Sequence, residues 1–169
     1  MVAKARELYA RMREVGLHPT YVTFNSLIDV FVRCNEMPEA WRYFGLMRSS
    51  GLKPDNFTCS TLIKGIKPSA KQLSKGIYHA AYNHRFHGPH PDMQVAFDLL
   101  EQMTNCPGQF RERPDEVLLN CMIDMCVRFR DLYGAVSLFN QMDRSFSCHQ
   151  SSSSYSNRDK HQRGVRSYH

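Results

Sequence analysis

The chain has 169 residues, of which 42% are hydrophobic, enough for one domain with a core. Lysine and arginine outnumber the acidic residues by 22 to 16, which excludes an acidic solvating protein and leaves a polyanionic partner open. No apolar run approaches the roughly 18 residues of a membrane helix, and no secretory signal or transit peptide is visible at the N-terminus. The six cysteines are too sparse for a disulfide scaffold. Buried thiols are expected within apolar helical patterns at Cys34, Cys59, Cys121 and Cys126.

The positive charge is concentrated in two segments. Residues 56–91 carry five basic groups and no acid, and residues 144–169 carry five basic groups and one acid. The total is +6, so the rest of the chain sums to −3. The basic character is therefore local and does not belong to the repeating part of the sequence.

The sequence repeats at an interval of 35 residues. A second pattern, alanine followed by apolar residues three, four and seven positions later, occurs four times, and these spacings place its members on one face of a helix. The 35-residue steps join Ala5 to Ala40, Met12 to Met47, Gly16 to Gly51, Pro19 to Pro54 and Thr23 to Thr58. The four patterns begin at Ala5, Ala40, Ala96 and Ala135.

The ends of the helices can also be read from the sequence. Gly16 and Gly51 follow the first two patterns, and glycine supplies the left-handed residue that ends a helix. A proline three positions later prevents the helix from continuing. The next helix is predicted to open at Thr23, and Pro38 is predicted to start its partner. The aromatic residues of that partner helix are predicted to be core between units: Trp41, Tyr43 and Phe44.

The repeating unit is therefore a hairpin of two antiparallel helices. One hairpin cannot bury its own apolar face, so we predict an all-α solenoid of stacked hairpins. The predicted divisions are 1–20, a second helix only; 21–55, a complete unit; 56–115, a unit with a His-rich basic insertion at about 65–91; 116–143, a partial unit; and 144–169, a Ser-rich basic tail expected to be disordered.

One unit resembles a known family at nearly every position. The run Val22-Thr23-Phe24-Asn25-Ser26-Leu27-Ile28, with the closing Gly51-Leu52-Lys53-Pro54-Asp55, is similar to the pentatricopeptide repeat. The 35-residue period favours this family over the tetratricopeptide repeat. The resemblance implies a right-handed superhelix that binds single-stranded RNA at about one base per repeat. It also implies an organelle, mitochondrion or plastid, and a role in RNA processing, stability, editing or translation.

The resemblance further implies which residues read the bases. In the family, the polar residue five places into a repeat and the residue that closes it form the reading pair, and an apolar residue three positions earlier packs on the bases. Asn with Asp implies a preference for uridine, and Ser with Asp implies a purine such as guanosine. The positions carried over are Asn25, Asp55 and Val22 in the complete unit, Ser60, Asp115 and Phe57 in the next, Asn120 and Val117 in the last, and Thr20 closing the first.

The chemistry of these residues agrees with that interpretation. An Asn amide carries a donor and an acceptor for a Watson–Crick edge, and a carboxylate beside it orients the amide. Base stacking is worth about 1–3 kcal/mol, so two modules supply about 2–6 kcal/mol, short of the roughly 8 kcal/mol of micromolar binding. We therefore expect weak, poorly specific RNA binding by this chain alone. A start in mid-repeat favours a fragment of a longer array; phosphate contacts and a partner are the alternative source of affinity.

The insertion holds further candidate residues. On one helix, lysines spaced three and four apart would form a stripe able to follow a phosphate backbone, although Pro68 is expected to divide it into two pairs. A solvated insertion is the alternative. The lysines are Lys64, Lys67, Lys71 and Lys75. We expect no metal site at the clustered histidines His79, His84, His87 and His90, which more simply make a polar surface. Cys121 and Cys126 are likewise expected to be core and not metal ligands.

No enzymatic motif is present in the sequence. It has no Gly-rich phosphate loop, no Gly-x-Ser-x-Gly elbow and no deaminase His-x-Glu with Cys-x-x-Cys. We predict no catalytic activity, no cofactor, and neither DNA nor a membrane as partner. The alternative function is a protein interaction scaffold, because the groove of stacked helical hairpins also suits a peptide.

Overall fold

The computed structural model describes residues 1–68 and 91–140. The predicted tail, most of the insertion with Lys71 and Lys75, and the four clustered histidines lie outside these ranges. The described residues contain helices and no strand. The elements are α1 (Val2–Glu14), α2 (Tyr21–Arg33), α3 (Met37–Ser49), α4 (Asn56–Gly65), α7 (Pro91–Asn105), the short 3-10 helix η1 (Pro107–Gln109) and α8 (Glu116–Arg128), followed by a helical segment at 132–140.

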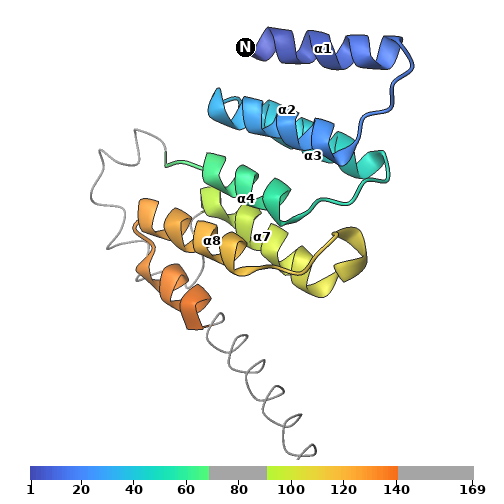
Figure 1. Cartoon of the computed structure of the whole chain (residues 1–169). Coiled ribbons are helices and arrows are strands. Elements are labelled where there is room, and N and C mark those ends of the chain that lie inside the picture. Colours follow the sequence, from blue (N-terminus) through green and yellow to red (C-terminus); the bar gives the residue numbers. More distant parts are fainter. Residues whose placement is uncertain (69–90, 141–169) are drawn as a thin grey trace, which may run out of the picture.

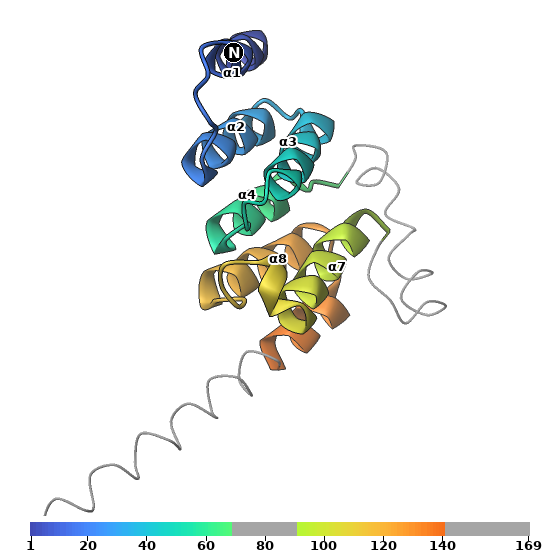
Figure 2. The ribbon, with the colours of Figure 1, turned by 90° about the vertical axis from the view of Figure 1, so that its right-hand side faces the viewer.

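The helices form a stack (Figures 1 and 2). Helix α2 packs against α3 to make one hairpin, and α4 packs against both α2 and α8. Helices α2, α4 and α8, each the first helix of a predicted unit, are therefore consecutive neighbours in one row. The all-α solenoid of antiparallel hairpins is confirmed, whereas the hand of the superhelix and the division into units stay predictions.

The predicted helix ends are largely confirmed. Gly16 and Gly51 have φ of +77° and +76°, as left-handed residues after a helix require. Pro38 lies in the first turn of α3. Helix α2, in contrast, begins at Tyr21, two residues before the predicted Thr23. Thr23 instead forms a capping box with Thr20, so the residue expected to open the helix is the third residue within it.

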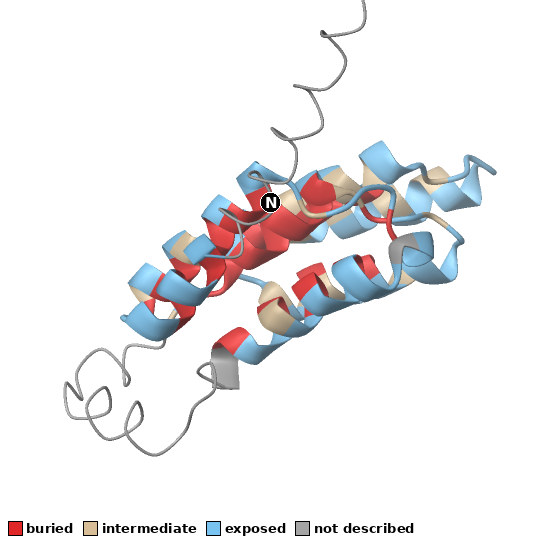
Figure 3. Cartoon of the chain, turned by 90° about the horizontal axis from the view of Figure 1, so that it is seen from below, coloured by how far each residue is buried: buried red, intermediate tan, exposed pale blue. Residues whose placement is uncertain are grey.

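The core lies along the faces that neighbouring helices turn toward one another (Figure 3). The ring of Tyr43 stacks on Phe31 at 4.9 Å between centroids and meets Tyr9 edge-on at 5.2 Å. Tyr43 and Phe44 are buried and Trp41 is half-buried, which confirms the aromatic prediction. All members of the patterns in α3 and α7 are buried: Ala40, Tyr43, Phe44 and Met47, and Ala96, Leu99, Leu100 and Met103.

The two outer patterns are only partly covered. Leu8 in the first is 58% exposed and Phe139 in the last is 64% exposed. Both lie on end helices of the described stack, which have a described neighbour on one side only. Burial of these positions thus depends on stacking and not on the spacing alone.

The cysteines behave mostly as buried thiols. Cys59, Cys121 and Cys126 are buried, and Cys34 is half-buried. Burial raises the pKa of Cys59 and of Cys126 to about 12. Across residues 1–68 and 91–140, no three His, Cys, Asp or Glu side chains gather as metal ligands would. None of the helices described has both the length and the apolar character needed to cross a bilayer.

Candidate nucleic-acid interface

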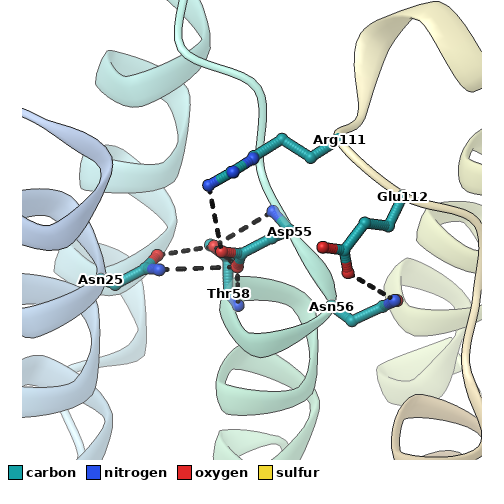
Figure 4. Close-up of polar contacts among 6 residues, drawn as sticks. All are labelled: Asn25, Asp55, Asn56, Thr58, Arg111 and Glu112. Carbon is teal, nitrogen blue, oxygen red and sulfur yellow. Dashed lines mark hydrogen bonds and ion pairs between the residues drawn. The ribbon is translucent and has the colours of Figure 1, made fainter.

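Asn25 and Asp55 meet across the boundary between two units. Asn25 lies one turn into α2, and Asp55 is the N-cap of α4. The Asn25 Nδ2 atom donates to Asp55 Oδ1 at 3.5 Å (Figure 4). Both side chains are half-buried. The amide and the carboxylate that are 30 residues apart in sequence are therefore side by side, while their role in reading a base stays a prediction.

Thr58 joins the two members of this pair. Its Oγ1 lies 2.6 Å from Asn25 Oδ1 and 2.7 Å from Asp55 Oδ1, and its backbone N–H donates to Asp55 Oδ1 at 2.8 Å. The contacts hold the amide with its oxygen toward Thr58 and its nitrogen toward Asp55. An amide has two N–H donors and two lone pairs, so one of each remains for a ligand beyond the described contacts. Sequence reasoning noticed Thr58 only as a repeat of Thr23.

Apolar side chains stand beside the first turn of each first helix. Val22, Phe57 and Val117 occupy the second position of α2, α4 and α8 and are 56%, 59% and 58% exposed. Equal exposure of three large apolar residues at one position means that the stack does not use them as core. They form a row on consecutive helices that an incoming planar group can contact. Their contact with bases stays a prediction.

The next predicted pair is built differently. Ser60 is 4% exposed, and its hydroxyl donates to the Asn56 carbonyl at 2.6 Å. Asp115 caps α8 by accepting from the Leu118 backbone N–H at 2.8 Å. Within residues 1–68 and 91–140, no hydrogen bond joins Ser60 to Asp115. Asn120 is exposed on α8. A reading role for these three residues stays a prediction.

Lys64 and Lys67, the first of the two expected lysine pairs, do not share a helix, because the break comes before Pro68. Their contact with phosphate stays a prediction. Helix α4 ends at Gly65, between Lys64 and Lys67, and Ile66 is extended. Pro68 disfavours helical geometry in the residue before it. Arg128 from α8 donates to the carbonyls of Lys64 and Ile66 at 3.3 and 2.7 Å, and so binds the chain where α4 ends. Lys64 and Lys67 are exposed at this end of α4, and Lys64 lies about 13.5 Å along the helix axis from Asp55.

An arginine that sequence reasoning missed lies beside the Asn25–Asp55 pair. The Arg111 guanidinium lies over the ring of Tyr21, 4.6 Å from its centroid, and its Nη1 is 4.0 Å from Asp55 Oδ2. Arg111 stands four residues before the closing Asp115, where the two preceding units have Gly16 and Gly51. That departure from the repeat was the sequence feature able to reveal it.

Stacked helical hairpins with a polar pair between adjacent first helices define a helical-repeat protein. Comparison with family models identifies the repeat. A model described as "PPR repeat family" matches residues 19–67, a "Pentatricopeptide repeat domain" model matches 3–34, and a "PPR repeat" model matches 117–145. The chain belongs to the pentatricopeptide repeat family.

Curated relatives carry the same family name. A chloroplastic pentatricopeptide repeat-containing protein of Arabidopsis thaliana is 40% identical over 88 residues, 47% of this chain and 10% of the relative. A second chloroplastic one from Arabidopsis thaliana is 29% identical over 140 residues, 83% of this chain and 15% of the relative. Pentatricopeptide repeat-containing protein 10, chloroplastic, of Zea mays is 41% identical over 61 residues, 36% of this chain and 8% of the relative. The chain thus spans only a small part of the relatives it matches.

Proposed function

We propose that this chain binds single-stranded RNA with a sequence bias, and that the Asn25–Asp55 pair favours uridine. The contact between Asn25 and Asp55, at 3.5 Å across the unit boundary, is the observation that carries the proposal. Val22 and Phe57 stand exposed on the two helices that supply the pair. A base inserted between these apolar side chains would present its edge to the free donor and acceptor of Asn25.

The setting we propose is an organelle, as part of RNA processing, stability, editing or translation. The support is the family together with the chloroplastic names of relatives from Arabidopsis thaliana and Zea mays. The affinity expected of this chain alone is modest, because about 2–6 kcal/mol from two stacked bases corresponds to a Kd above about 1 μM.

Fluorescence anisotropy with short oligouridine and oligoadenosine tests the proposal. The wild-type chain is expected to prefer oligouridine, and Asn25→Ala is expected to lose most of that preference. Asn105→Ala is the matched control. Asn105 is an exposed amide on α7, the second helix of its predicted unit and not a first helix like α2, and it donates only to Glu101 in the described structure. Absence of RNA binding, or equal preference in Asn25→Ala and wild type, would refute the proposal and favour the protein scaffold.

The apolar row is tested in the same assay. Val22→Ala is expected to weaken binding of every oligonucleotide by a similar factor, since stacking tolerates any base. Val95→Ala on α7 is its control, with 48% exposure against 56% for Val22. An equal effect of the two variants would remove Val22 from the interface.

A further inference from the structure

We propose that Arg111 binds a phosphate of the RNA strand next to the nucleotide at the Asn25–Asp55 pair. The inference rests on the proposed function and deepens it. It assigns a contact with the sugar–phosphate backbone of the RNA to Arg111, a residue of the third unit's closing turn. Arg111 is not one of the base-reading positions.

The position of the guanidinium is the first argument. Tyr21 and Asn25 are four residues apart on α2 and therefore share a face. Arg111 lies over the Tyr21 ring and reaches Asp55 Oδ2 with Nη1 (Figure 4 shows the latter contact). The cation thus flanks the pair, although its own backbone belongs to the segment between α7 and α8.

The turn that carries Arg111 is anchored on both sides, which is the second argument. The Arg111 backbone N–H donates to the Pro54 carbonyl at 2.9 Å. Asn56, which is 6% exposed, donates from Nδ2 to the Arg113 carbonyl at 2.9 Å and to Glu112 Oε2 at 3.1 Å. Phe110, immediately before Arg111, is 2% exposed. The backbone that carries the Arg111 side chain is therefore held beside the pair by contacts of the turn itself.

The replacement of glycine is the third argument. The turns after α1 and α3 have Gly16 and Gly51 at positive φ. Arg111, at the equivalent position, does not have a positive φ. The η1 turn ahead of it provides another route back to the next helix. The extra residues of this turn thus put a cation where the earlier units have no side chain.

The charges favour a phosphate as the ligand. A base seated on the pair brings its own phosphates near the Asp55 carboxylate, and Arg111 offsets that repulsion. A guanidinium has five N–H donors, and the Asp55 contact at 4.0 Å leaves most of them available. Its side chain is 44% exposed, and stacking on an aromatic ring leaves the planar edge free for bidentate phosphate binding.

The test compares Arg111→Gln with Arg113→Gln on the full chain. Both variants remove one positive charge from the same turn, and the Arg113 side chain is exposed. Binding of oligouridine and oligoadenosine is measured by anisotropy across a salt series, with thermal unfolding to verify that both variants fold. Arg111→Gln is expected to weaken both oligonucleotides by about fivefold at low salt and to reduce the salt slope by about 0.7. Arg113→Gln is expected to keep the wild-type slope.

Three results would overturn the inference. An unchanged salt slope in Arg111→Gln would mean that the side chain touches no phosphate. Equal slopes in the two variants would mean diffuse attraction. A loss confined to oligouridine would make Arg111 a positioning residue for Asp55, since phosphate contacts carry no base information. Failure of the proposed function is distinguishable, because wild type itself would then bind no RNA.

Discussion

The units that close with Asp55 and Asp115 have the same carboxylate at the same position. Within the described structure, only Asp55 is hydrogen-bonded to the first helix of its own unit. Asp55 contacts Asn25 through both a direct hydrogen bond and Thr58. Asp115 accepts from the Leu118 backbone. The third residue of the helix differs between the two units, because Thr58 supplies a hydroxyl where Leu118 supplies a fully buried hydrocarbon.

The residue five places into the unit also favours a contact in the complete unit only, where it is Asn25, and not in the next unit, where it is Ser60. The Asn25 side chain is long enough to leave α2 and reach Asp55. The Ser60 side chain is short and bonds back to the carbonyl four residues earlier in α4. A closing aspartate alone therefore does not build a polar pair. Where the pair forms, a long amide on one helix and a hydroxyl at the third position of the next both contribute to it.

The largest expected effect comes from removing a fully buried ring from the core of the complete unit. Phe31→Ala deletes a ring that is fully buried and stacked on Tyr43, so the free energy of unfolding should fall by about 3–5 kcal/mol. Urea unfolding followed by circular dichroism measures it. Val22→Ala, on the exposed face of the same helix, should change stability by less than about 0.5 kcal/mol. A comparable loss in both variants would contradict the assignment of the two faces.

Removing each closing carboxylate compares the two units directly. Asp115→Ala removes an N-cap, at a cost of about 1 kcal/mol. Asp55→Ala removes an N-cap and also the acceptor for Asn25 and Thr58, so it should cost about 2 kcal/mol. The same urea measurement applies. Equal losses would show that the contact between Asn25 and Asp55 adds no stability.

Removing the hydroxyl that joins the pair gives a smaller effect. Thr58→Val keeps the size of the side chain but takes a donor from the part-buried Asn25 and Asp55 oxygens, at a cost of about 1 kcal/mol. It should also reduce the preference for oligouridine, because the amide is then less firmly oriented. Thr61→Val is the control, since its hydroxyl bonds only to a carbonyl within α4. A preference unchanged in Thr58→Val would contradict the role of the hydroxyl.

The buried thiols of α4 and α8 should have the smallest effect, because they change the free energy of unfolding only at alkaline pH. Burial raises the pKa of Cys59 and Cys126 from 9.0 to about 12, whereas Cys106 is exposed. The folded state keeps both thiols neutral, so their contribution to stability is complete below pH 9 and is lost as the pH rises from about 9 to about 12. Urea unfolding at pH 8 and pH 10.5 measures the loss. A Cys59→Ala/Cys126→Ala variant should lose less stability than wild type over that interval.

Alkylation distinguishes the same cysteines in the folded chain. Iodoacetamide at pH 8 should modify Cys106 first, because only the thiolate reacts and access is required. Cys59 and Cys126 should react after urea is added. Mass spectrometry of digested samples reads the order, and early modification of Cys59 in the folded chain would contradict its burial.

The helices, most of their ends and the family follow from the amino-acid sequence alone. The 3.6-residue periodicity, Gly16, Gly51 and Pro38 act within a few residues of their own positions, so local chemistry is enough to predict them. The family resemblance brought Asn25 and Asp55 together as a candidate pair, and in the fold their side chains lie 3.5 Å apart. Their role in reading a base stays a prediction.

Contacts between side chains of different units became visible only in the folded chain. Ser60 is buried within α4, Thr58 links α4 to Asn25 on α2, and Arg111, in the segment before α8, lies over Tyr21, a residue 90 positions earlier. Such contacts depend on how closely neighbouring helices approach and on where an irregular turn returns. Neither quantity is set by periodicity, because a period describes what units share and not the residues by which one unit differs from the next.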